Sequence, residues 1–208
     1  MAARRRQGER AGLTADQVLD AAVALAERDG VEKLSMRRLA AEVGVEAMTI
    51  YHYVPSKDAL LDGIVERVVA EAVRVPPDAA DWQAMLVTYA YDLRASLLAH
   101  PSVVPLLATR PAVTTATARI VEGILEALGR AGLDPVNGLR LVHALTALVI
   151  GQLTTQGDGS DAGDDLAVDQ ERFPLLSQAV AGGAADPEAR FAFAIEALVA
   201  GAAPAAGD

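Results

Sequence analysis

Four side chains between Thr49 and Lys57 are suited to donating hydrogen bonds to phosphate oxygens. Thr49, Tyr51 and Tyr53 each carry a hydroxyl group, and Lys57 adds a positive charge a few residues later. Groups of this kind position a protein on a nucleic-acid backbone without reading its sequence. Two tyrosines that flank His52 within one exposed turn favour such a contact, although packing aromatics could have the same spacing. The segment therefore predicts a contact with nucleic acid.

Sequence readout needs groups that reach base edges, and the same region offers three candidates. Arg37 is the best of them for a bidentate contact with a guanine edge. The alternative for Arg37 is a solvated surface cation. Ala47 and Met48 could meet thymine methyl groups, which is a weaker indication.

Caps and apolar periodicity predict the elements that position these side chains. Thr14 begins a helix that stops at Asp29-Gly30, and Ser35 caps a second helix. Val43-Gly44-Val45 forms a turn, and a third helix continues to about Tyr53. This order is that of a helix-turn-helix unit, whose second helix enters the DNA major groove while the first crosses the backbone.

The rest of the chain also indicates helices, without a convincing strand pattern. Capping residues predict further helix starts at Ser56, Asp81, Asp134-Pro135 and Asp186-Pro187, and another helix is expected from about Thr114 to Arg130. The prolines between 101 and 111 indicate an irregular stretch, and residues 157–169 indicate a loop. The predicted fold class is all-α. Its predicted parts are a helix-turn-helix DNA-binding head (1–55), a connecting helix (56–75) that ends near Val75–Pro77, and a helical ligand-binding and dimerisation body (76–208).

Composition limits the function classes. The chain has 208 residues and no cysteine, which excludes disulfides, thiolate-bound zinc and a cysteine nucleophile. Its net charge is −10, but residues 1–75 hold 11 basic and 12 acidic side chains, and the acidity lies mainly in the body. Binding to phosphate depends on local cations, so the net charge does not exclude DNA. The Arg4–Arg6 segment could follow phosphates or the minor groove, or be a disordered tail.

Membrane insertion and secretion are not expected. The longest strongly apolar window, Leu139–Leu153, is interrupted by polar residues and shorter than the about 20 residues that span a bilayer. No apolar run follows the N-terminal arginines, so no secretory signal is indicated. The sequence predicts a soluble, cytoplasmic protein.

The predicted helix 135–156 is apolar on two sides. A helix of this kind must be covered twice, so we expect one side to face the core and the other a partner subunit. Its two stripes are Leu139, Val142, Thr146, Val149 and Leu153, and Leu141, Leu145, Leu148 and Thr155. The last helix could add Phe191, Ala194, Ile195, Leu198 and Val199 to the interface. A two-fold homodimer would place two recognition helices one DNA turn apart, roughly 34–36 Å.

The stretch from about Thr14 to Ile64 resembles the N-terminal domain of the TetR family of transcriptional repressors. The resemblance is specific because it fixes residue types at many offsets. It is carried by Gly30, Ser35-Met-Arg-Arg-Leu-Ala, Val43-Gly-Val, Thr49-Ile-Tyr-His-Tyr-Val and Lys57-Asp-Ala-Leu-Leu-Asp. It implies an all-helical homodimer whose body binds a small molecule that weakens the affinity for operator DNA.

The body is similar, more weakly, to the tetracycline repressor branch of that family. The similarity lies in Asp81-Trp-Gln, Leu97-Leu98, Ala99-His100, Thr109-Arg110-Pro111 and Gly132-Leu133. In that branch a histidine meets a magnesium–drug chelate where this chain has Leu106, and other drug contacts are replaced by Tyr89, Leu93 and Thr155. Aliphatic groups cannot replace the oxygen and imidazole ligands of a hard cation. We therefore predict no metal, no cofactor and a more apolar ligand than tetracycline.

The candidates for the ligand pocket come from all parts of the body. They are Trp82, Met85, Tyr89, Leu93, Leu106, Thr109, Leu128, His143 and Thr146. For the aliphatic members a purely structural place in the core is favoured. Tyr89, Thr109 and His143 are better candidates, because an apolar interior needs a reason to hold polar groups. A hydrogen-bonded core histidine nevertheless remains the more common role for His143.

These observations favour a ligand-responsive, DNA-binding transcriptional regulator. The hypothesis is a homodimeric repressor that an apolar small molecule releases from a palindromic operator. An enzyme is not expected, since there is no Ser/His/Asp arrangement, no phosphate-binding glycine loop and no histidine spacing typical of a metal site. An all-helical carrier of apolar ligands is the alternative, and the sequence does not distinguish a repressor from an activator.

Overall fold

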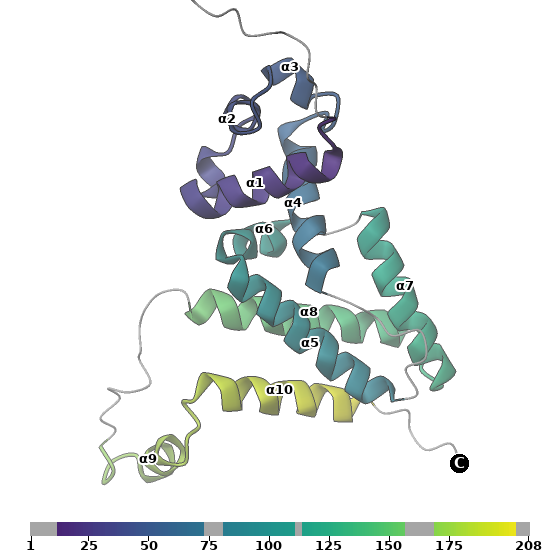
Figure 1. The fold of residues 1–208 in the computed structure, drawn as a ribbon. Coiled ribbons are helices and arrows are strands. Elements are labelled where there is room, and N and C mark those ends of the chain that lie inside the picture. Colours follow the sequence, from purple (N-terminus) through teal and green to yellow (C-terminus); the bar gives the residue numbers. More distant parts are fainter. Residues whose placement is uncertain (1–11, 73–80, 111–113, 157–168, 203–208) are drawn as a thin grey trace, which may run out of the picture. The chain divides into compact units, whose positions relative to one another are not determined.

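The computed structural model describes residues 12–72, 81–110, 114–156 and 169–202, which form helices and contain no strand (Figure 1). The predicted all-α class is confirmed. The chain divides into two compact units, Met1–Arg67 and Val68–Asp208. The division falls inside a helix of the predicted connecting segment 56–75. The predicted seam at Val75–Pro77, the Arg4–Arg6 segment and residues 157–168 of the predicted loop lie outside the described residues.

The first unit is built from three helices and the start of a fourth. They are α1 (Ala15–Asp29), a short 3-10 turn η1 (Val31–Lys33), α2 (Met36–Glu42), α3 (Ala47–Ile50) and α4 (Lys57–Ala72). The predicted capping box at Thr14 is present, and Gly30 ends α1 with a φ of 88°. Each helix contributes apolar residues to the buried centre, which includes Val18, Leu25, Leu39, Ile50, Leu60 and Ile64.

The turn between α2 and α3 depends on one glycine. Gly44 has a φ of 72°, in the left-handed region where a Cβ atom is disfavoured. Its N–H donates to the carbonyl of Ala41, and the N–H of Val45 donates to the carbonyl of Ala40 at 2.9 Å. These two bonds are those of a Schellman motif, which satisfies the last carbonyls of a helix. The turn thereby sets the direction in which α3 leaves α2.

We expect Gly44→Ala to destabilise the first unit by about 1–2 kcal/mol, the usual cost of a left-handed conformation with a Cβ atom. No atom lies within 4 Å of the position that this Cβ would take, so the cost would be conformational alone. Urea unfolding followed by circular dichroism measures it. Gly12→Ala is the matched control in the same unit, because that position is equally open and not left-handed, and it should be neutral. Equal stability of the two variants would contradict the role of Gly44.

The third helix is shorter than predicted. It ends at Ile50, and Tyr51–Tyr53 form a turn, not a continuation to about Tyr53. The N–H groups of Tyr53 and Val54 both donate to the carbonyl of Ile50 at 2.9 Å. Pro55 prevents a continuation of the helix through Val54, since a proline disfavours the helical conformation of the residue before it. Ser56 then caps α4 as predicted, accepting a bond from the N–H of Ala59 at 3.0 Å.

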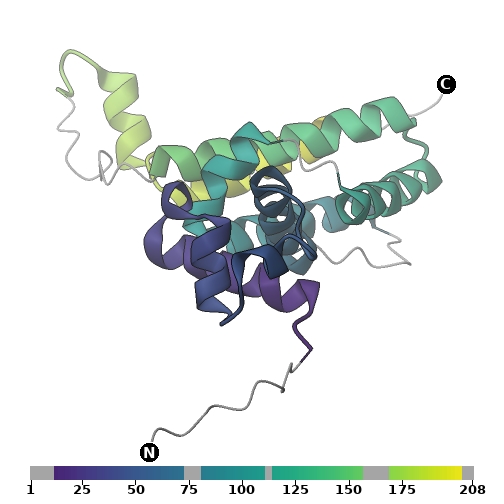
Figure 2. The same cartoon turned by 90° about the horizontal axis from the view of Figure 1, so that it is seen from above.

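The second unit packs around α8. Its helices are α5 (Trp82–Ala99), η2 (Pro101–Val103), α6 (Val104–Thr109), α7 (Thr115–Arg130), α8 (Pro135–Gln156), α9 (Pro174–Ala181) and α10 (Pro187–Gly201). α5, α6, α7 and α10 all contact α8, and α7 lies beside its N-terminal half (Figure 2). The predicted starts at Asp81, Thr114, Asp134 and Asp186 are confirmed, because each of these side chains accepts a backbone N–H of the helix that follows.

Two helices of this unit differ from the predictions. Residues 101–109 were expected to be irregular but form η2 and α6, with Pro101 and Pro105 in the first turns. Proline is tolerated there because the first N–H groups of a helix have no partner within it. α9 was not predicted and likewise begins at a proline, Pro174. Pro101 and Pro105, which were assigned to an irregular stretch, thus begin helices.

α8 is also longer than the apolar window Leu139–Leu153, on which the expectation of no membrane span was based. Within the described residues it is the one helix long and apolar enough to cross a membrane by length and composition, over Pro135–Thr155. Its contacts with four neighbouring helices are those expected of a central helix in a helical body.

Candidate functional site

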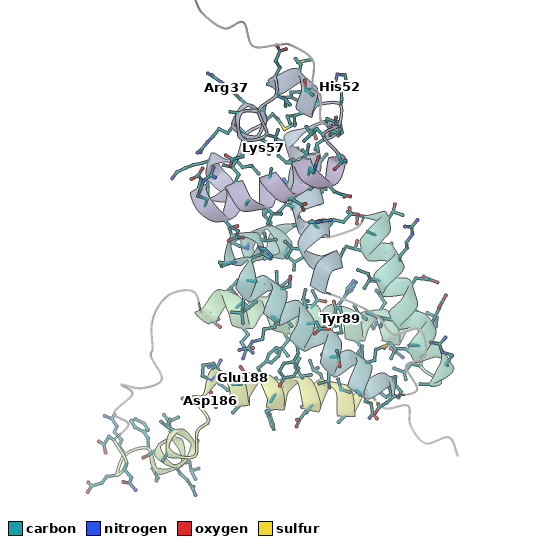
Figure 3. All side chains as sticks on the ribbon, viewed as in Figure 1. Arg37, His52, Lys57, Tyr89, Asp186 and Glu188 are labelled. Atoms are coloured by element: carbon teal, nitrogen blue, oxygen red, sulfur yellow. The ribbon has the colours of Figure 1, made fainter. Side chains whose placement is uncertain are left out.

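The predicted DNA-binding side chains lie on α2, on α3 and around the start of α4. Arg37, Met48, Tyr51, His52 and Lys57 are exposed, and Met48 is 71% exposed although it is apolar. Figure 3 shows Arg37 and His52 pointing outward from the first unit. The other predicted members, Ala47, Thr49 and Tyr53, are half-buried. The eight residues thus occupy the helix-turn-helix segment and retain accessible polar and apolar groups.

The two neighbouring arginines of α2 have different roles. Arg38 donates to the carboxylate of Asp29 at 2.6 Å and to the carbonyl of Lys33 at 3.2 Å, which attaches α2 to the end of α1. Arg37 forms no hydrogen bond or ion pair among the described residues and is exposed. Its guanidinium group is therefore available to an external partner.

An ion pair between an arginine and a glutamate also links the first two helices. Arg28 of α1 donates to both carboxylate oxygens of Glu42 on α2, at 3.0 and 2.7 Å. The hydrogen bond from Arg28 lowers the pKa of Glu42, and the pairing raises the pKa of Arg28. Because the folded pKa of Glu42 is depressed, its contribution to stability is present above the ordinary carboxyl pKa. It is lost as the pH falls through the depressed value.

The start of α4 presents donors suited to phosphate. The first N–H groups of a helix lack partners within it, and they attract anions together with the helix dipole. Lys57 is the first residue of α4 and is exposed, while the Ser56 hydroxyl accepts a hydrogen bond from the N–H of Ala59. Lys57 therefore adds its charge where free backbone donors already favour an anion.

A buried polar pair joins α5 to α8 in the second unit, near the Tyr89 label of Figure 3. The hydroxyls of Tyr89 and Thr146 lie 2.7 Å apart, and Thr146 donates to the carbonyl of Val142 at 2.8 Å. Because the single Thr146 proton is used in that bond, Tyr89 is the donor of the pair. Burial raises the pKa of the Tyr89 phenol. The Tyr89 oxygen keeps its acceptor capacity inside an apolar core.

The remaining pocket candidates separate by exposure. Met85, Leu93, Leu106 and Leu128 are buried like Tyr89, whereas Trp82 and Thr146 are half-buried. Two expectations of an interior position are wrong, because Thr109 and His143 are exposed. The hydroxyl of Thr109 donates to the carbonyl of Pro105 one turn earlier, so the helix backbone satisfies it. His143 lies on the outer side of α8. Whether the nine residues line one pocket stays a prediction.

The outer faces of α8 and α10 form an unpartnered surface. Of the predicted stripes of α8, Val142, Val149, Leu153, Leu141 and Leu145 are buried within the chain itself. The same holds for Phe191, Ile195 and Val199 of α10. The exposed residues are instead mostly small or apolar, and the outer-face surface is defined here as Leu139, His143, Ala147, Gly151, Phe193 and Ala197.

Phe193, which is 74% exposed, was missing from the predicted interface. The sequence contained an indication of its exposure. Phe191 and Phe193 are two residues apart on one helix and therefore cannot face the same side. The two helices of this surface run antiparallel. Gln152 near the end of α8 donates to the carbonyl of Pro187 at the start of α10, at 2.9 Å.

An exposed helix-turn-helix segment followed by a larger helical unit defines the class of DNA-binding transcriptional regulators. A model of bacterial regulatory proteins of the tetR family matches residues 18–64, and a model of the tetracyclin repressor-like C-terminal domain matches residues 75–204. The chain therefore belongs to the TetR family and is a ligand-responsive, DNA-binding regulator. The carrier alternative is not favoured.

Individual relatives agree with this assignment. An HTH-type transcriptional regulator of Saccharopolyspora erythraea is 32% identical over 205 residues, which cover 94% of this chain and 86% of the relative. The HTH-type transcriptional repressor DrrR1 of Streptomyces coeruleorubidus is 30% identical over 184 residues, covering 85% and 68%. The crystal structure of ActR from Streptomyces coelicolor in complex with actinorhodin has a TM-score of 0.80 at 25% identity, covering 95% and 100%. The first two of these relatives are named as a transcriptional regulator and a transcriptional repressor, and ActR as a TetR family protein.

Proposed function

We propose that the protein is a cytoplasmic, homodimeric repressor that an apolar small molecule releases from a palindromic operator. The observation that carries the DNA part is the exposed helix-turn-helix segment. In it Arg37 has no partner among the residues that the structure describes, whereas Arg38 pairs with Asp29. In this proposal Arg37, Ala47 and Met48 contact base edges. Thr49, Tyr51, Tyr53 and Lys57 hold the backbone, and His52 lies among them.

Dimerisation is supported by the outer-face surface. An exposed phenylalanine beside small residues such as Ala147 and Gly151 gives a second copy a side chain to bury and room for close approach. Interfaces of two-fold dimers are self-complementary, so one antiparallel helix pair could meet the same pair of the partner. Two heads would then contact two half-sites about 34–36 Å apart, which explains the expectation of a palindrome.

An apolar effector is supported by the composition of the second unit. Its covered core consists mainly of aliphatic side chains, and the Tyr89–Thr146 pair gives it one directional polar group. Among the similar proteins, ActR has been solved in complex with actinorhodin. The effector would lift repression only as far as it prefers the state with low DNA affinity. A shift from 1:99 to 99:1 needs about 5.5 kcal/mol of differential affinity.

A fluorescence anisotropy titration against the promoter region beside its own coding sequence tests this function. We expect salt-dependent binding that is tighter for a palindromic duplex than for a scrambled duplex of equal length. Addition of the effector should release the labelled duplex. Failure to bind any palindromic duplex at low salt, together with binding of apolar ligands, would favour the carrier alternative.

Two substitutions separate base reading from backbone contact. Arg37→Ala should remove about 1–3 kcal/mol of discrimination at one base pair and leave the other positions as selective as before. Lys57→Gln should lower the affinity for all duplexes by the same factor. It should also reduce the slope of log affinity against log salt concentration by about one. Competition anisotropy with a set of single-base-pair operator variants measures both effects. Unchanged preference in Arg37→Ala would show that its base contact is wrongly assigned.

A further inference from the structure

A cleft of about 640 Å³ lies between the start of α8 and the end of α10. Its apolar walls include Leu133 from the turn before α8, Leu141 from α8, Leu198 from α10, and Ala202 directly after α10. Arg140 is the positively charged side chain that lines the cleft. This volume is within the range of about 300–1,000 Å³ that is usual for small-molecule sites. None of the residues predicted for the effector pocket lines this cleft.

A chain of hydrogen bonds orients Arg140. One oxygen of the Asp134 carboxylate accepts the backbone N–H groups of Val136 and Asn137, at 3.0 and 3.1 Å. The other accepts the side-chain amide of Asn137 at 2.6 Å, and this fixes which way the amide points. The amide oxygen of Asn137 in turn accepts Nη1 of Arg140 at 3.1 Å.

The hydrogen-bond partner of Arg140 is the neutral amide of Asn137. The Asp134 carboxylate also lines the cleft, but its oxygens accept N–H groups of Val136 and Asn137. Among the described residues Arg140 forms no ion pair with a carboxylate. Most of its N–H donors therefore stay available. A planar guanidinium with free donors suits bidentate recognition of a carboxylate or another oxyanion.

We propose that this cleft binds an anionic amphiphile. The carboxylate pairs with Arg140, and the hydrocarbon chain lies against Leu133, Leu141 and Leu198. The site goes beyond the proposed function, because it is separate from the predicted effector pocket and does not depend on DNA binding. It borders the outer-face surface, since Ala197 belongs to both. A protein with a net charge of −10 repels anions at long range. Selectivity for the acid must therefore come from Arg140 itself.

Calorimetric titration of the full chain, in the oligomeric state that it adopts in solution, tests the proposal. The probes are decanoate, the uncharged decanol and the short anion acetate, each below the concentration at which it aggregates. We expect decanoate to bind more tightly than decanol, and acetate to bind undetectably, because both the charge and the chain contribute. Arg140→Gln should weaken decanoate binding by about tenfold or more, the effect of one charge-assisted contact, and leave decanol unchanged.

Two further variants locate the site. Arg119→Gln removes another exposed arginine, on α7, and should leave both probes unaffected. Ala202→Trp places a large side chain in the cleft and should abolish binding of both probes. The proposal is overturned if the wild type binds no decanoate or if Arg140→Gln has no more effect than Arg119→Gln. It is also overturned if Arg140→Gln weakens both probes equally, or if decanoate still binds Ala202→Trp.

Discussion

Phe193→Asp is expected to convert the proposed dimer into monomers and to weaken operator binding by about 10²–10⁴-fold, the gain that linking two binding modules usually provides. Phe193 is 74% exposed within the chain, so the substitution should leave the fold intact. A phenylalanine buries about 150–250 Å² when it is fully covered. The substitution would remove this buried apolar area from the interface. The new carboxylate would also have to be desolvated there without a partner charge.

Sedimentation velocity and DNA anisotropy on the same samples measure the two effects together. Leu98→Asp is the matched control, because it adds the same charge at an apolar residue that is 52% exposed but lies on α5. It should remain dimeric and bind the operator like the wild type. A Phe193→Asp protein that sediments as a dimer would contradict the proposed interface. A monomeric wild type would contradict dimerisation itself.

Phe191 and Phe193 of α10 show why the sequence predicts the helices of the proposed interface better than the residues that form its contacts. Apolar stripes marked α8 and α10 correctly as helices, and the capping aspartates located their starts. However, periodicity states only that a residue faces an apolar environment, which can be the chain's own core or a partner. Most of the stripe residues proved to be core, whereas Leu139 lies on the outer-face surface. That surface consists mainly of small residues, which carry little hydrophobic signal.

The head was predictable for a different reason. Its turn, caps and polar residues are local features, and Gly44, Thr14 and Ser35 each act on backbone groups within a few residues. The separate roles of Arg37 and Arg38 were not predictable, because Asp29 approaches only one of them and that depends on the tertiary fold. The pocket was harder still. Thr109 and His143 are polar residues on apolar helices, and the sequence does not show which side of the helix is covered.

Phe191→Ala is expected to lower the free energy of unfolding by about 3–5 kcal/mol, because its side chain is completely buried and a cavity would remain. The ring is also held by specific contacts. The Tyr91 ring meets it edge-on with centroids 5.1 Å apart, and the guanidinium of Arg94 lies 4.7 Å from its centroid. Arg94 is only 13% exposed and pairs with Glu188 of the first turn of α10 at 2.7 Å. Removal of the ring would therefore take away packing from the largely buried side chain of Arg94.

Urea unfolding at fixed protein concentration measures the loss, and two further variants show its origin. Phe191→Leu keeps most of the volume and should cost less than about 1.5 kcal/mol from packing, plus the aromatic and cation contacts of the ring. Phe173→Ala removes a ring that is 47% exposed and should cost far less than Phe191→Ala. Because α5 and α10 meet at this ring, a loss below about 1 kcal/mol in Phe191→Ala would mean that Arg94 and Glu188, not the ring, hold the two helices together.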